Sequence, residues 1–187
     1  ATSSSLLLTT VNDILDLATV DAGIMDLEVD EVDVAVLFAS VEQSFAGRFA
    51  EAGVELKTAV ASGITNFKAD GQRLRQVIGN LISNAVNHAP EGSAVNLSAK
   101  LDGSDVVISI QDEGPGIPSD VLASVFDRFV AHGNGRRRGG AGLGLSIVKG
   151  LVELHKGSVS IQSNAESGTR VDCRFPADPA KFRQAAE

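Results

Sequence analysis

Apolar positions recur along the chain with two periods, one typical of helices and one typical of strands. Helical spacing is found at 6–23, 34–52, 72–89 and 143–155, with a short helix over 119–125 for which Ser119 is the candidate N-cap. Alternation predicts strands at 27–32, 54–60, 66–69, 95–101, 105–111, 158–163 and 169–175. The mixed order and tight turns favour an α/β (α+β) two-layer sandwich of a mixed sheet and about three helices, not a doubly wound parallel sheet.

The first helix carries an apolar seam. Leu7, Val11, Ile14 and Ala18 are spaced by four, three and four residues, and Met25 continues the line past an interruption. This spacing is typical of a helical bundle, and a single helix cannot bury such a seam alone. Two interpretations stay open: the helix docks on its own domain, or it is half of a helical hairpin or dimer interface.

A polar stripe runs along the helix expected at 72–89. At about 100° per residue, its amides share one side of the helix, opposite the apolar residues. Amides are poor helix formers, so the stripe suggests a ligand; an ordinary solvated face is the alternative. A carboxamide oxygen suits Mg²⁺ when phosphates supply the negative charge. The stripe consists of Arg73, Gln76, Asn80, Asn84 and Asn87.

Two glycine-rich segments follow the stripe. In Asp112-Glu-Gly-Pro-Gly-Ile-Pro, Gly114 and Gly116 would let the backbone approach a ligand and Asp112 would accept a hydrogen bond, although a plain turn explains the same residues. Gly139-Gly-Ala-Gly-Leu-Gly-Leu opens a helix, so the N–H groups of 142–144 would face a phosphate. No Gly-Lys-Ser/Thr follows and no strand directly precedes, which excludes a Walker loop and a dinucleotide fingerprint.

The loop 130–138 is the fourth candidate. It has no core-forming residue and carries Arg136, Arg137 and Arg138. A solvated basic loop is the ordinary interpretation of such a run. Beside a phosphate site it would instead close over a triphosphate as a lid, with Arg128 of Phe126-Asp-Arg-Phe within reach of an anion.

Composition narrows the function classes. A net charge of −8 argues against nucleic acid or an anionic membrane as the main partner. The single cysteine, Cys173, excludes a disulfide framework and a cysteine metal site, and fits a reducing cytoplasm. No apolar run approaches the roughly 18–20 residues of a membrane span. The chain opens without Met or a signal-peptide pattern, so we expect an excised fragment.

The order of the four signals strongly resembles the ATP-binding catalytic domain of sensor histidine kinases, in the superfamily shared with gyrase, the Hsp90 chaperones and MutL. There the same motifs are the N, G1, F and G2 boxes, and Gly168-Thr169 resembles a last, weaker box. The resemblance implies the Bergerat ATP-binding fold over 27–176. It also implies part of a dimerisation and phosphotransfer hairpin over 1–26, where LLTTVNDILDLATVDA resembles its second helix, and a tail over 177–187.

The resemblance implies a role for each matched residue. Asn84 would bind the Mg²⁺ that bridges the ATP phosphates, with Asn80 supporting it, and Asp112 would take the adenine amino group. Ile117 and Leu145 would be hydrophobic walls. Asn80 and Arg128 are the implied catalytic residues, and the implied ATP-binding set is Asn80, Asn84, Asn87, Asp112, Gly114, Gly116, Ile117, Arg136, Arg137, Arg138, Gly140, Gly142, Leu143, Gly144, Leu145 and Thr169.

Three departures from the family pattern matter. Asn87 stands where the family usually has Lys or Arg, and Ala141 where it usually has Thr or Ser. The family's phosphoacceptor box would precede residue 1, and none of His88, His132 or His155 lies in such a context. The chain is therefore not expected to be its own phosphorylation substrate in the family's manner.

Three function classes follow. The first is a kinase catalytic domain that donates the γ-phosphate of Mg-ATP to an acceptor on a dimerisation helix, for relay to a response regulator. The second is a nucleotide-binding regulatory module acting through protein contacts. The third, a hydrolysing ATPase, is disfavoured because Asn80 stands where the gyrase branch has its general-base Glu. Expected partners are ATP or ADP, a response regulator or other signalling protein, and a second copy of the full-length protein. The fragment is expected in a bacterial cytoplasm without membrane contact, any membrane anchor lying upstream.

Overall fold

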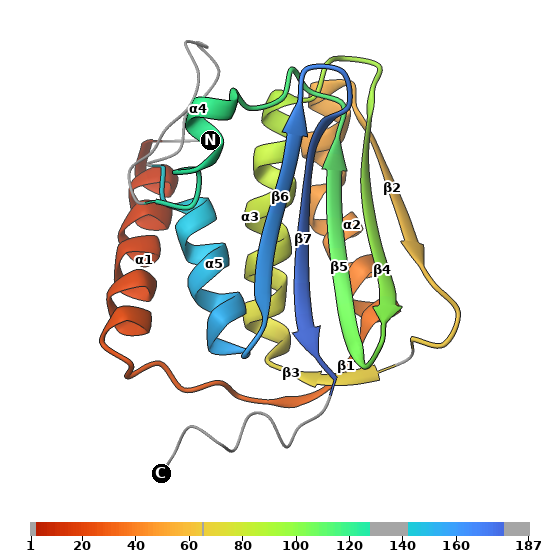
Figure 1. Cartoon of the computed structure of the whole chain (residues 1–187). Coiled ribbons are helices and arrows are strands. Elements are labelled where there is room, and N and C mark those ends of the chain that lie inside the picture. Colours follow the sequence, from red (N-terminus) through yellow and green to blue (C-terminus); the bar gives the residue numbers. More distant parts are fainter. Residues whose placement is uncertain (1–2, 65, 128–141, 178–187) are drawn as a thin grey trace.

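A five-stranded mixed sheet forms one layer of the protein (Figure 1). The computed structural model describes the backbone of residues 3–64, 66–127 and 142–177. The strand order is β2-β4-β5-β7-β6, with β2 parallel to β4 and all other neighbours antiparallel. The strands are β2 (Glu55–Val60), β4 (Ala94–Asp102), β5 (Asp105–Asp112), β6 (Ser158–Asn164) and β7 (Gly168–Pro176).

Three helices cover one face of this sheet: α2 (Val34–Ala52), α3 (Gly71–His88) and α5 (Gly144–Leu154) (Figure 1). Alternate residues of the central strands face the helices and form a continuous core with their apolar sides. The two-layer sandwich predicted from the sequence is therefore confirmed. The buried strand residues of this core are Val95, Leu97, Ala99, Val106, Ile108, Ile110, Val171, Cys173 and Phe175.

The first helix, α1 (Ser3–Asp21), lies beside α5 (Figure 1). A β-carbon added to Gly150 would stand 3.1 Å from Cγ1 of Val20, so the two helices approach closely because residue 150 has no side chain. Leu17 is buried, whereas Val11 and Ile14 of the predicted seam are 45% and 47% exposed. The helix thus docks on its own domain through one side and leaves the seam open. Among the described residues, no helix is long and apolar enough to cross a membrane.

Two short strands, β1 (Asp30–Asp33) and β3 (Asn66–Ala69), pair antiparallel and lead into α2 and α3. Asp70 is the N-cap of α3: its Oδ1 accepts from the backbone N–H groups of Gln72 and Arg73. Its Oδ2 accepts from the N–H of Glu28, and its own N–H donates to Nε2 of the buried His155. These bonds fix where α3 begins and thereby which of its residues face α5.

Most predicted elements agree with the structure to within one or two residues, and three differ by three residues at one end. The helix expected at 6–23 already begins at Ser3. The strand expected at 27–32 begins only at Asp30. The short helix α4 (Ser119–Leu122) is a single turn, and the expectation that Ser119 is its N-cap is wrong. Pro118 occupies that position with extended backbone, and no side chain caps the turn. Proline at φ −56° enters a turn without strain, so Ser119 becomes the first helical residue.

Candidate functional site

The start of α5 lies against the middle of α3. A β-carbon on Gly144 would stand 3.9 Å from Nδ2 of Asn84 and 4.0 Å from Cβ and Cγ of Asn80. Gly142, with φ of +69°, turns the chain into α5, and no side chain of a described residue accepts a hydrogen bond from the first N–H groups of this helix. The positive end of the α5 dipole therefore opens next to two carboxamides, an arrangement suited to an anion.

Asn80 contributes an unsatisfied polar atom to this junction. Its Nδ2 is buried and, among the described residues, has no hydrogen-bond partner. A buried amide without a partner costs roughly 1–3 kcal/mol. Such a group inside a well-packed helix pair is best explained by a ligand or water that completes it.

Asp112 ends β5 in a nearly buried position, 7% exposed. Its Oδ1 accepts from the N–H of Gly114 at 2.8 Å and from the N–H of Thr169 at 3.3 Å. Burial raises the pKa of this carboxyl, and the two backbone N–H groups partly offset the effect. No described residue donates to Oδ2, so this oxygen remains available to a donor on a ligand.

The glycines after Asp112 are required by close contacts. A β-carbon on Gly114 would stand 3.0 Å from the carbonyl oxygen of His88 at the end of α3. At Gly116 it would stand 2.4 Å from the carbonyl oxygen of Asn164, and Gly116 also has φ of +74°. The loop is thereby held between the end of α3 and the β6–β7 turn.

A hydroxyl pair anchors the far side of this loop. Oγ of Ser163 accepts from the N–H of Ile117 at 2.8 Å and lies 2.8 Å from Oγ1 of Thr169. The predicted residues Asp112, Gly114, Gly116, Ile117 and Thr169 are thus brought together. Ser163 was missed by the sequence analysis, because nothing in its local pattern separates it from any other strand serine.

The side chains of the stripe on α3 contact different elements along the helix. Arg73 Nη1 and Gln76 Nε2 both donate to the Asp16 carboxylate of α1, at 3.1 and 2.7 Å. At the other end, Oδ1 of the exposed Asn87 accepts from Arg48 Nη2 of α2 at 3.0 Å. Neither Asp16 nor Arg48 carries a sequence signal, since each partner lies dozens of residues away.

Residues Asn80 and Asn84 are therefore the part of the stripe that lies beside the start of α5. Leu143 is buried in the core, 1% exposed, so only its backbone is open to a ligand, and its carbonyl already accepts from Ser146 Oγ and the N–H of Ile147. Leu145 and Ile117 are half-buried. Arg128, Arg136, Arg137, Arg138, Gly140 and Ala141 lie outside the described residues.

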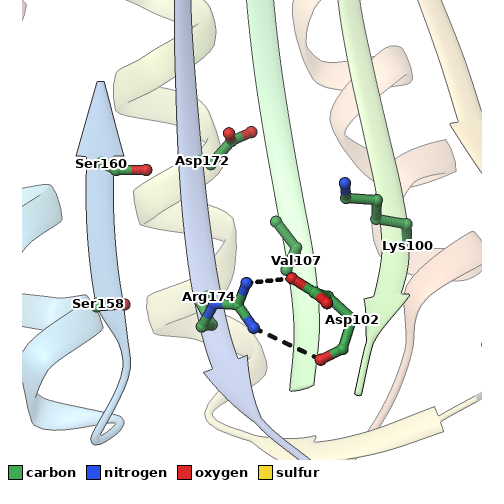
Figure 2. A pocket seen from close by; sticks show the side chains of 7 residues that line it. All are labelled: Lys100, Asp102, Val107, Ser158, Ser160, Asp172 and Arg174. Carbon is green, nitrogen blue, oxygen red and sulfur yellow. Dashed lines mark hydrogen bonds and ion pairs between the residues drawn. The ribbon is translucent and has the colours of Figure 1, made fainter. Parts of the chain in front are cut away.

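A separate polar cavity of about 210 Å³ lies on the outer face of the sheet, and Figure 2 shows its side chains. Arg174 donates to Asp102 and, from Nη1, to Asp105 at 3.2 Å, so its charge is neutralised within the sheet. Asp102 and Asp105 flank the β4–β5 turn, at the opposite end of β5 from Asp112. This cavity is distinct from the candidate site. It is lined by Lys100, Asp102, Val107, Ser158, Ser160, Asp172 and Arg174.

The candidate site combines neutral amides, an uncapped helix start and one buried carboxylate. Within the described part of the chain, no cluster of three His, Cys, Asp or Glu residues could hold a metal by itself. A metal here would need ligands from a bound phosphate as well as from an amide. The arrangement is suited to a phosphorylated ligand whose other end donates a hydrogen bond to Asp112.

Comparison with known proteins identifies relatives of the same organisation. The chain is 38% identical to the sensor protein DivL of Caulobacter vibrioides over 89% of this chain and 21% of DivL. Within the family of sensor kinases, the motifs of this chain also suggest a resemblance to DivL. The chain is 36% identical to the sensor-like histidine kinase R01002 of Rhizobium meliloti, over 99% of this chain and 36% of that protein. The chain thus spans about a fifth to a third of these relatives.

Solved structures share the fold. Full-length ShkA in complex with AMPPNP matches 91% of this chain and 35% of that one, with a TM-score of 0.81 and 35% identity. The Acinetobacter baumannii histidine kinase AdeS matches 94% of this chain and 80% of that one, with a TM-score of 0.79 and 23% identity. The sequence model of the histidine kinase-, DNA gyrase B- and HSP90-like ATPases matches residues 69–179. The site, the fold and these matches together show that the chain belongs to the family of histidine kinase-, DNA gyrase B- and HSP90-like ATPases.

Proposed function

We propose that this chain binds Mg-ATP between α3 and α5 as the catalytic domain of a two-component sensor kinase. In the parent protein it donates the γ-phosphate to an acceptor on a dimerisation helix, for relay to a response regulator. The observation that carries this proposal is the meeting of Asn80 and Asn84 with the uncapped start of α5 at Gly144. The solved complex of the related ShkA with AMPPNP supports nucleotide binding at such a domain.

The adenine end of the nucleotide is assigned to Asp112. Oδ1 is occupied by the N–H groups of Gly114 and Thr169, so Oδ2 is left to accept a hydrogen bond from the adenine amino group. The carboxylate is held rigidly and is nearly buried, which strengthens a hydrogen bond to it. Ile117 and Leu145, both half-buried, supply apolar walls for the ring.

The phosphate end is assigned to Asn84, Asn80 and the N–H groups at the start of α5. These residues fit a magnesium ion, because Asn84 offers a hard carboxamide oxygen and the orphaned Nδ2 of Asn80 can donate to a phosphate oxygen. When bound, Mg²⁺ neutralises phosphate charge. The α5 dipole and the amide of Asn80 stabilise the same charge and orient the chain of phosphates. Arginines 128 and 136–138 remain the proposed partners of the γ-phosphate.

The open seam on α1 is assigned to a second copy of the parent protein. Val11, Ile14 and Leu15 are 45%, 47% and 57% exposed while Leu17 packs on the domain. Their spacing suits a four-helix bundle. A full-length protein that stays monomeric in ultracentrifugation at micromolar concentration would contradict this assignment.

A regulatory module without efficient transfer is the second candidate. Asn87 supports it, since a neutral amide stands where a basic residue would contact phosphate, and its Oδ1 is already engaged by Arg48. The two candidates differ in one result. Both bind nucleotide, and only the kinase labels a protein with phosphate.

The experiment uses the full-length parent protein with ATP labelled on its γ-phosphate. Acid-labile label on the parent, lost in Asn84→Ala, is the expected result for the kinase. Binding of ATP without label on the parent or on a supplied response regulator would instead favour the regulatory module. Absence of nucleotide binding would contradict both.

A further inference from the structure

We propose that Arg48, on α2, is a phosphate-binding residue of the nucleotide site. This inference rests on the proposed function and adds a side chain from outside the recognised motifs. Arg48 Nη1 donates to Oγ of Ser83 at 2.8 Å, and Nη2 donates to Oδ1 of Asn87 at 3.0 Å. Both acceptors lie on the last two turns of α3, on either side of Asn84 in sequence.

No carboxylate of a described residue forms an ion pair with Arg48. Both of its acceptors are neutral, and none of the ion pairs among the described residues includes it. Other arginines of the chain, such as Arg73 and Arg174, are paired with carboxylates. A guanidinium has five N–H donors, and two hydrogen bonds leave three for a ligand. Arg48 is therefore both held in place and free to bind an anion.

Among the described residues, the side chains assigned to the nucleotide site carry no positive charge. Asn80, Asn84 and Thr169 are neutral and Asp112 is acidic, so the described site residues bring no positive side chain to a triphosphate. Among the described hydrogen bonds of Ser83 and of the three asparagines of the α3 stripe, only those with Arg48 have a positively charged donor. Asn87 is three residues after Asn84 and shares its side of α3. Asn87 thus acts as an adaptor that holds a guanidinium beside the proposed metal ligand.

A purely structural role predicts different behaviour. In that case Arg48 is a cross-link between α2 and α3, like Arg75, whose Nη1 donates to Ser40 of α2 near the start of α3. Arg75 joins the same two helices with the same chemistry, far along α3 from Asn84. Arg75→Ala is therefore the matched control for Arg48→Ala.

The test measures binding of Mg-ATP and of adenosine by the 187-residue chain and by Arg48→Ala, Arg48→Lys and Arg75→Ala. We expect Arg48→Ala to weaken ATP binding by about tenfold, since one charge-assisted hydrogen bond is lost, and to leave adenosine binding unchanged. Arg48→Lys should recover part of the loss, and the loss should shrink as salt is raised. Arg75→Ala should bind both ligands as the unaltered chain does.

Three results would overturn the inference. Equal ATP affinity in Arg48→Ala and Arg75→Ala would show that the guanidinium does not reach the phosphates. Parallel loss of ATP and adenosine binding, independent of salt, would show a cross-link. Failure of the unaltered chain to bind ATP would overturn the proposed function itself, and this inference with it.

Discussion

The backbone N–H of Thr169 donates to Oδ1 of Asp112 at 3.3 Å, although 57 residues separate the two along the chain. A second donor, the N–H of Gly114, reaches the same oxygen. The carboxylate is thereby turned so that Oδ2 is the oxygen open to a ligand. The recognition of adenine proposed above depends on this orientation.

Replacing Asp112 with Asn should weaken ATP and adenosine binding together, by about tenfold or more. The side-chain oxygen of Asn would keep the bonds to Gly114 and Thr169, which places its NH₂ where Oδ2 was. Two donors would then face each other at the adenine amino group. Calorimetry with both ligands measures the effect.

Asp105→Asn is the control for this substitution. Asp105 lies at the other end of β5, on the outer face of the sheet, where it is paired with Arg174. Its loss should leave both affinities unchanged. Equal affinity in Asp112→Asn and Asp105→Asn would contradict the adenine assignment.

Asp112→Asn should also change how the folding stability depends on pH. Burial raises the pKa of Asp112 above 3.8, so the folded state holds its proton at a pH where the unfolded state has lost it. The contribution of Asp112 to stability is therefore fully present below 3.8 and is lost as pH rises through the folded pKa. We expect urea unfolding to show that the stability of Asp112→Asn, relative to the unaltered chain, increases as the pH rises through this acidic range. A constant difference would mean that Asp112 titrates normally.

His155 should respond to pH in the opposite sense. It is fully buried, its Nε2 accepts from the N–H of Asp70, and burial lowers the pKa of its imidazole below 6.5. The unfolded chain takes up this proton as pH falls through 6.5, whereas the folded chain resists it, so stability is present above 6.5 and declines below it.

His155→Phe tests this directly. The variant keeps a ring beside Phe175 but leaves the N–H of Asp70 without its acceptor, which costs about 1–3 kcal/mol at neutral pH. Its stability should then decline less than that of the unaltered chain as pH falls below 6.5. Denaturant unfolding above and below that pH measures both effects, and an unchanged pH slope would contradict a neutral, buried His155.

The docking of α1 should depend on Asp16. Its carboxylate accepts from Arg73 and Gln76 of α3, and all three side chains are partly buried. Asp16→Ala should speed amide hydrogen exchange in α1 while exchange in the central strands stays slow. Asp13→Ala is the control, since burial and the nearby charge of Asp16 raise the pKa of Asp13 and its ionised form does not favour docking. Equal exchange in α1 of both variants would assign docking to apolar packing alone.

The elements could be predicted from sequence because their signals are local. The range of α3 follows from its apolar period, and α2 is predicted to the residue because Gly53 ends it in the left-handed region. The motifs likewise identified Asp112, Gly114 and Gly116. Both glycines are required in the structure, because a β-carbon would collide with His88 at position 114 and with Asn164 at position 116.

The partners of the stripe could not be predicted, because each comes from a distant part of the chain. Asp16 lies 60 residues before Gln76, and Arg48 lies 39 residues before Asn87. Helical spacing shows which residues share one side of a helix, but it does not show over what length of that side a given neighbouring element makes contact. The helical period places the polar residues of α3 on one side, but in the structure different parts of that side contact three different elements, α1, α5 and α2.

Asn84 and the start of α5 are the residues proposed to hold the phosphates of Mg-ATP, and titration of ATP with and without Mg²⁺ tests this assignment. Calorimetry of the 187-residue chain should show binding that strengthens when Mg²⁺ replaces a chelator. In Asn84→Ala the Mg²⁺ effect should disappear, while binding of adenosine, held at Asp112, should persist. Absence of ATP binding by the unaltered chain at millimolar nucleotide with Mg²⁺, or a full Mg²⁺ effect in Asn84→Ala, would contradict the assignment.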